Sequence, residues 1–183
     1  VDTNSIKTPQ TILIQKENNS LSNLFAFNQA EEDKDTTTKA DILELRAKAI
    51  DSYFSERDMP LAGYGAKMVK EADINDIDWR LIPAISVRES TGGKFACKKV
   101  KFSAFGWGSC KINFKSYDES IEILAKNLGG NNPKTAHYYD NKTTEQILKK
   151  YNPDSIVPGY SKQVIKIMNS IGEENLGEDK VEA

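Results

Sequence analysis

Histidine, cysteine and long hydrophobic runs are scarce or missing in this chain, and each shortage argues against a class of protein. The one histidine, His137, argues against a histidine-rich metal site and against a Ser-His-Asp hydrolase. The two cysteines, Cys97 and Cys110, form no Cys-x-x-Cys pair, which disfavours a zinc or thioredoxin-type motif. No run of about 18 apolar residues occurs, so the sequence predicts no membrane span. We therefore expect neither a metal nor another cofactor.

An excess of charge of one sign is also missing. Of the 183 residues, 28% are charged and 38% are hydrophobic, and the formal net charge is only −2. This balance gives no case for a nucleic-acid partner. The length suits one domain with a single core, and we expect a monomer.

The two cysteines leave two interpretations open. They are either unpaired thiols in the core or a disulfide that closes a short loop between Cys97 and Cys110. We favour the disulfide, which requires an oxidising compartment. The chain begins at Val1 without a methionine, and we expect that an upstream segment was removed. Both observations favour an extracytoplasmic location.

Both ends of the chain are polar. Residues 1–38 are rich in Asn, Thr, Ser and acids, and they read as a flexible segment or linker, because such a composition buries too little apolar surface to fold. Residues 173–183 are rich in acids and read as a disordered, solvated tail. The sequence therefore predicts one folded domain over residues 39–172.

Helical spacing of apolar residues dominates this domain. Residues 94–115 lose that spacing and show a short alternation of apolar and lysine residues, which predicts a small β-hairpin or an irregular loop. The expected class is therefore mainly α (α+β). The predicted helices cover residues 40–57, 61–73, 79–89, 117–128, 143–150 and 160–171.

Glu89 ends an apolar face of the helix predicted at 79–89. Ile82, Ile85 and Glu89 are spaced to lie on one side of that helix, and Ser90 follows the acid. A carboxyl group beside apolar side chains loses water, which favours its neutral form. Protonation of a glycosidic oxygen needs such a neutral acid.

The alternative for Glu89 is an ordinary role at a helix end. The carboxylate would then be solvated, or paired with Arg88 or Arg80. Spacing alone leaves the two interpretations evenly balanced.

Several motifs resemble cell-wall glycosidases of the lysozyme superfamily. Residues 77–90 (Ile-Asp-Trp-Arg-Leu-Ile-Pro-Ala-Ile-Ser-Val-Arg-Glu-Ser) resemble the catalytic-helix segment of these enzymes, and lytic transglycosylases carry a similar Glu-Ser pair. Residues 104–108 (Ala-Phe-Gly-Trp-Gly) resemble the Phe-Gly motif of N-acetylglucosaminidases of glycoside hydrolase family 73. Residues 116–121 and 151–153, with Tyr160, are similar to later segments of that family. The resemblance covers about residues 40–172, and the order of the motifs is more specific than any one of them.

This resemblance implies a lysozyme-like domain that cuts the β-1,4 glycan strands of bacterial peptidoglycan, its expected partner. Glu89 would be the catalytic acid, and Tyr151 would position the substrate. Sugar-binding clefts use aromatic faces, so we add further candidates for substrate contact. These are Trp107, Tyr138, Tyr139 and Tyr160, together with Ser90 of the Glu-Ser pair.

The segment expected to supply a second carboxylate contains none. Residues 90–117 hold no Asp or Glu, although most glycosidases use two acids. Three mechanisms remain open: Glu89 alone with a 1,6-anhydro product, assistance from the substrate's acetamido group, or a carboxylate from elsewhere. The candidates for the last are Asp118, Glu119 and Asp140.

The same segment carries six lysines, which suggests a cationic lip that attracts the carboxylates of peptidoglycan peptide stems. An ordinary solvated surface is the alternative. The missing second acid also keeps open a rival function for the whole domain, a non-catalytic module that binds peptidoglycan and retains the fold. The six lysines are Lys94, Lys98, Lys99, Lys101, Lys111 and Lys115.

Overall fold

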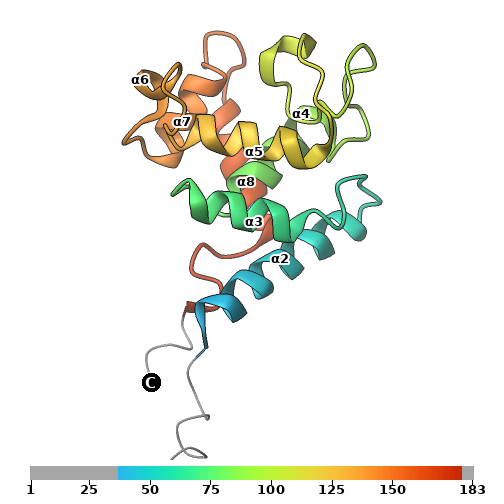
Figure 1. Cartoon of the computed structure of the whole chain (residues 1–183), viewed down its shortest axis with the longest axis vertical. Helices are drawn as coiled ribbons and strands as arrows, with labels where there is room; N and C mark the ends of the chain where they lie inside the picture. The colour runs from blue at the N-terminus through green and yellow to red at the C-terminus, as the bar shows by residue number, and fades with distance from the viewer. Residues whose placement is uncertain (1–36, 179–183) are drawn as a thin grey trace, which may run out of the picture. The chain divides into compact units, whose positions relative to one another are not determined.

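The structure, a computed structural model, describes residues 37–178. In this part of the chain there are seven α-helices and one short 3-10 helix, and no β-strand, so the mainly helical class is as predicted. None of these helices has the length and apolar character needed to cross a membrane. In chain order (Figure 1) they are α2 (Lys39–Ser55), α3 (Gly65–Ile74), α4 (Leu81–Ser90), η1 (Trp107–Cys110), α5 (Tyr117–Leu128), α6 (Ala136–Tyr139), α7 (Thr144–Tyr151) and α8 (Tyr160–Ile171).

A capping box sets the beginning of α2. The Thr38 side chain accepts a hydrogen bond from the Asp41 backbone N–H at 3.2 Å, and the Asp41 carboxylate accepts one from the Thr38 N–H at 2.9 Å. The two residues thereby satisfy amides that a helix start otherwise leaves without partners. The first helix of the described residues thus begins at Lys39. The rest of the polar N-terminal segment, residues 1–36, lies outside the described residues.

Helix α4 runs through the centre of the core. Its first six residues, Leu81 to Ser86, are all buried, which is the pattern of a helix covered on every side. Pro83 lies in the first turn, where a missing N–H costs no helical hydrogen bond. Asp78 accepts hydrogen bonds from the backbone and the guanidinium of Arg80, at 2.9 Å and 2.6 Å, and fixes the chain just before the helix.

Helices α3, α5 and α8 pack against α4. Helix α8 packs along α4 and also contacts α7, while α3 lies between α2 and α5 (Figure 1). Each contributes an apolar stripe to a single core, whose largest fully buried side chains include Phe54, Leu61, Met68, Ile85 and Leu124. This packing holds the C-terminal end of α4 at a fixed place, where the candidate site lies.

Residues 94–115 form an irregular loop with the 3-10 helix η1, and the predicted β-hairpin is not formed there. One backbone hydrogen bond, from Phe114 N to Lys101 O at 3.3 Å, crosses the loop. Phe102, Ser109 and Cys110 have positive φ values, which are incompatible with an extended strand. The β component of the predicted class is therefore wrong for this segment, and the irregular alternative describes it.

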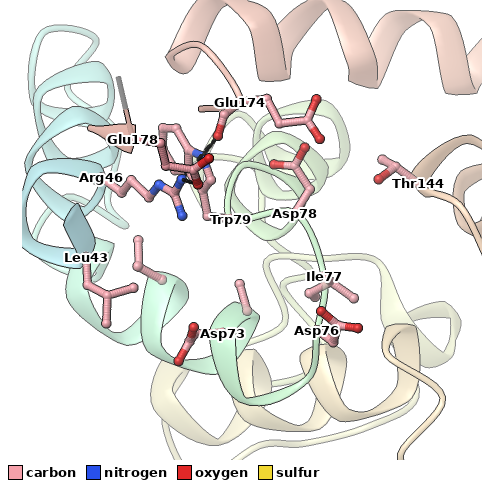
Figure 2. Close-up of a pocket in the computed structure, with 12 residues that line it drawn as sticks. Leu43, Arg46, Asp73, Asp76, Ile77, Asp78, Trp79, Thr144, Glu174 and Glu178 are labelled. Carbon is pink, nitrogen blue, oxygen red and sulfur yellow. Dashed lines mark hydrogen bonds and ion pairs between the residues drawn. The ribbon is translucent and has the colours of Figure 1, made fainter. Parts of the chain in front are cut away.

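Residues 173–178 fold back onto the domain, although the sequence predicts a disordered tail from residue 173. The Trp79 indole donates a hydrogen bond to Glu174 O at 3.0 Å, and Arg46 donates to Leu176 O at 3.2 Å and pairs with Glu178 (Figure 2). Leu176 also packs against the core. Composition suggested a solvated tail because it shows the acids but not these backbone acceptors. Residues 179–183 lie outside the described part of the chain.

Candidate active site

Glu89 is the penultimate residue of α4, and its side chain is half-buried. One carboxylate oxygen, Oε1, accepts a hydrogen bond of 2.6 Å from the hydroxyl of Tyr160, the first residue of α8. Neither arginine considered as a partner is paired with it. Arg88 donates to Gln163 at 2.7 Å, and Arg80 is held by Asp78. The partner of this oxygen is therefore the hydroxyl of a buried tyrosine and neither of the two arginines.

The loop after α4 brings Gly106 against the other oxygen of Glu89. A Cβ atom added to Gly106 would lie 2.6 Å from Glu89 Oε2, and the backbone there has φ +66°, a left-handed conformation. Both the close approach to Oε2 and the left-handed backbone require glycine at this position. The two oxygens of Glu89 thus have different surroundings, a tyrosine hydroxyl at Oε1 and a glycine backbone at Oε2.

Ser90 connects the end of the helix to this loop. Its side chain is buried, donates a hydrogen bond to Ala104 O at 2.6 Å and accepts one from Gly93 N at 2.9 Å. The prediction that Ser90 contacts substrate is therefore wrong. The hydroxyl instead holds the segment before Gly106 close to the end of α4.

Three aromatic rings form a stack that ends at Glu89. Trp107 stacks on Tyr151 with 5.8 Å between ring centroids, and Tyr151 stacks on Tyr160 with 6.1 Å. The Tyr151 hydroxyl donates a hydrogen bond to Phe105 O, which ties the end of α7 to the loop. Because these rings come from η1, α7 and α8, the stack fixes three elements around the acid.

Both tyrosines of this stack keep their hydroxyl protons. Burial, followed by the hydrogen bond to Glu89 and its negative charge, raises the pKa of Tyr160 far above its ordinary value. Burial and then the charge of Glu89 likewise raise the pKa of Tyr151. Tyr160 is therefore a permanent hydrogen-bond donor to Glu89 at neutral pH.

A cavity of about 510 Å³ opens beside this acid. Glu89 is the one carboxylate among its described lining residues. Asp118, Glu119 and Asp140, the carboxylates considered for a second catalytic role, are not among them. The lining consists of Glu89, Gly106, Trp107, Gly108, Ser109, Tyr151, Asn152 and Ile156.

The aromatic candidates divide into three groups. Trp107 and Tyr151 line the cavity, as a role in substrate contact requires. Tyr139 and Tyr160 are 6% and 1% exposed, so their prediction as substrate contacts is wrong: Tyr139 packs in the core, and Tyr160 acts on Glu89. Tyr138 is 43% exposed but lies on α6, between His137 and Lys150, and not in the cavity lining.

Sequence reasoning missed several residues of the cavity wall as candidates for substrate contact. Ser109 and Ile156 carry no recognisable motif, and Ile156 is 72% exposed on the loop after α7. Asn152 was noted only as part of the Tyr-Asn-Pro motif. The available signal for Asn152 and Ile156 was their place after the helix predicted at 143–150, because binding residues lie disproportionately on loops.

Cys97 and Cys110, for which we favoured a disulfide, are bonded to each other, with Cα atoms 5.9 Å apart. Cys110 directly follows Ser109 of the cavity wall. The disulfide therefore links the cavity wall at Ser109 to the part of the loop around Cys97.

A second hollow, of about 340 Å³, lies at the opposite end of α4 and is lined by Arg46, Trp79 and several acids (Figure 2). Most of these carboxylates already have cationic partners, such as Lys39 for Asp73 at 2.8 Å. Its polar groups are engaged in holding residues 173–178, so the cavity beside Glu89 is the better candidate site.

No family model, no curated protein and no solved structure matches the chain.

Proposed function

We propose that this protein cleaves the β-1,4 glycan strand of bacterial peptidoglycan and that Glu89 is its general acid. The supporting observation is a half-buried carboxyl group, with no cationic partner among the described residues, in a cavity of about 510 Å³ that has an aromatic wall. Small-molecule sites commonly measure about 300–1,000 Å³. The order of the motifs along the chain supports a lysozyme-like domain of the lytic transglycosylase or N-acetylglucosaminidase kind.

The two oxygens of Glu89 have separate roles in this proposal. Tyr160 donates to Oε1, which is therefore the acceptor oxygen of the neutral acid. Oε2, beside Gly106 of the cavity wall, carries the proton that is transferred to the glycosidic oxygen. The bond between the anomeric carbon and that oxygen breaks, and Glu89 is left as a carboxylate.

The nucleophile in this proposal comes from the sugar itself. A second enzyme carboxylate would have to lie roughly 5–9.5 Å from the first, depending on the stereochemical course, and the described lining of the cavity has no other carboxylate. Two groups of the substrate can attack the anomeric carbon. The C6 hydroxyl gives a 1,6-anhydro end, and Glu89 takes its proton. The C2 acetamido oxygen gives an oxazolinium ion that keeps its N–H proton, and water then opens this ring while Glu89 takes the proton of the water.

We further propose that the protein acts outside the cytoplasm, where peptidoglycan lies. The disulfide between Cys97 and Cys110 supports this location, because such bonds persist in oxidising compartments.

The same missing carboxylate favours a second candidate, a peptidoglycan-binding module without turnover. Glu89→Gln distinguishes the two, because it keeps the shape of the side chain but removes the transferable proton. If the domain is an enzyme, the substitution should lower turnover by about 10²–10⁴-fold and leave wall binding unchanged.

Mass spectrometry of digested peptidoglycan is the measurement. Anhydro-muramic ends identify attack by the C6 hydroxyl, and reducing glucosamine ends identify the acetamido route. Asp140→Asn, which removes a carboxylate outside the cavity, is the matched control and should digest normally. Binding to the wall without any released fragment from the unsubstituted protein would establish the module instead.

A further inference from the structure

The disulfide between Cys97 and Cys110 brings two lysine-bearing segments of the loop close together. Lys98 and Lys99 follow Cys97 directly, and Lys111 follows Cys110. Because the two cysteine Cα atoms are 5.9 Å apart, the Cα atoms of Lys98 and Lys111 lie within about 14 Å of each other. We call Lys98, Lys99 and Lys111 the loop lysine cluster. Lys111 is two residues from Ser109 of the cavity wall, and the disulfide holds Lys98 and Lys99 in the same region.

These three cations have no partner in the described part of the chain. All three are exposed, and none forms an ion pair with a residue of 37–178. The neighbouring Lys94 and Lys115 differ, because the first donates to Arg57 O at 2.8 Å and the second pairs with Glu119 at 3.7 Å. The loop therefore keeps a group of uncompensated positive charges together at one edge of the cavity.

The surrounding sequence does not neutralise the loop lysine cluster. Residues 90–117 contain six lysines and no acid, whereas the whole chain has a net charge of −2, so the remaining residues carry −8. Like charges held together repel each other, and an external anion relieves that repulsion. The contrast with the rest of the chain indicates that this loop faces an anionic partner.

We propose that the loop lysine cluster binds the carboxylates of the peptide stems of a peptidoglycan strand whose sugars occupy the cavity. This inference rests on the proposed function and names the part of the substrate that the cavity itself does not contact. Peptide stems project from the glycan strand beside the bond to be cut, and each carries several carboxylates. The lysines belong to the loop that also supplies Ser109 of the cavity wall, so they are placed to meet such substituents.

The test measures binding of the full chain carrying Glu89→Gln, so that the substrate is not consumed. Insoluble peptidoglycan freed of phosphate polymers is used in two forms, one native and one with its stem carboxylates converted to amides. Replacing Lys98, Lys99 and Lys111 by Ala should weaken cosedimentation with native peptidoglycan by about tenfold, since each exposed ion pair contributes little and three are lost together. Binding to the amidated form should change less than twofold.

A second triple variant is the control. Lys70, Lys126 and Lys166 are exposed and lie on α3, α5 and α8, so their replacement by Ala removes the same charge elsewhere. It should bind both forms of peptidoglycan normally. Raising the salt concentration, which needs no substitution in the cluster, should weaken binding to the native form more than to the amidated form.

Three results would overturn the proposal: unchanged binding of the loop variant, equal losses on both forms, or equal losses in both triple variants. Loss of binding to phosphatidylglycerol vesicles, with wall binding retained, would assign the cluster to a membrane surface and overturn it as well. None of these results depends on turnover. Failure of the proposed cleavage would instead appear as absent products from the protein with Glu89 intact.

Discussion

At the scale of single residues, Tyr160 contacts the acid of the candidate site but is not among the described residues that line the cavity. It is 1% exposed, and its one polar atom donates to Glu89 Oε1 at 2.6 Å. Under the proposed function it is therefore a positioning residue, and Oε2, beside Gly106, is the oxygen that would face the substrate.

Replacing Tyr160 by Phe keeps the aromatic stack and removes this donor. We expect kcat to fall by about 10–100-fold, because a hydrogen bond to a charged group is worth about 1.5–3 kcal/mol. KM should remain within about twofold, because the residue does not reach the cavity. Steady-state kinetics on soluble glycan strands measures both constants. Tyr138→Phe, an exposed control, should be neutral, and a Tyr160→Phe variant altered mainly in KM would contradict the positioning role.

At position 106 the site has no room for any side chain. In Gly106→Ala the new Cβ would lie 2.6 Å from Glu89 Oε2, and an L residue at φ +66° costs about 1–2 kcal/mol. We expect a lower melting temperature and a loss of turnover of more than tenfold. Gly63→Ala separates the two effects, since Gly63 has φ +92° and nothing within 4 Å of an added Cβ. It should be destabilised but fully active; equal activity losses in both variants would refute the contact.

Spacing put Glu89 at the end of an apolar helix face, and the structure has it there beside a cavity, while its role as a catalytic acid stays a prediction. Which tyrosine would touch it could not be inferred. Tyr139, Tyr151 and Tyr160 share one side-chain chemistry, and their burial depends on how α6, α7 and α8 pack, which no local pattern records. The hydrogen bond of Ser90 could not be inferred either, because its acceptor, Ala104 O, lies 14 residues away in the sequence.

At the scale of elements, periodicity located the longer helices well. The helices predicted at 117–128 and 160–171 have the same bounds as α5 and α8. Helix α6 (Ala136–Tyr139) was missed, because four residues are too few to show a helical period. The loop of residues 94–115 was ambiguous, because its alternating residues resemble a strand while its positive φ values appear only in the structure.

The disulfide is the main covalent constraint on that loop. In the chain-entropy model a closed loop of this length contributes about 3 kcal/mol to the free energy of unfolding. We expect reductant to lower the melting temperature and to reduce turnover, because Cys110 adjoins the cavity wall. Calorimetry and kinetics with and without reductant measure both effects. The double variant Cys97→Ser, Cys110→Ser should show both losses from the start and no response to reductant; a response there would point to another cause.

At the scale of the whole molecule, the buried tyrosines make the free energy of unfolding decrease as the pH rises into the alkaline range. The pKa of Tyr160 is raised in the folded protein, whereas an unfolded tyrosine titrates near pH 10. Below about pH 10 Tyr160 holds its proton in both the folded and the unfolded state, so its contribution to stability does not change with pH. Above it only the unfolded chain releases the proton, so the free energy of unfolding falls by up to about 1.4 kcal/mol per pH unit for this residue.

Urea denaturation between pH 8 and pH 11 tests this dependence. The Tyr160→Phe variant should lose less stability over that interval than the unsubstituted protein, and Tyr138→Phe should behave like the latter. An unchanged slope in Tyr160→Phe would show that Tyr160 does not keep its proton in the fold.

The hydrogen bond between Glu89 and Tyr160 spans 71 residues of sequence and joins the central helix to the last one. A chain still emerging from the ribosome or a translocation channel, with residue 160 not yet released, therefore contains the acid but not the hydroxyl that orients it. Under the proposed function, competence to cut is acquired only at the completion of the domain. If the protein degrades cell wall as proposed, such timing would protect the cell while the protein is being made.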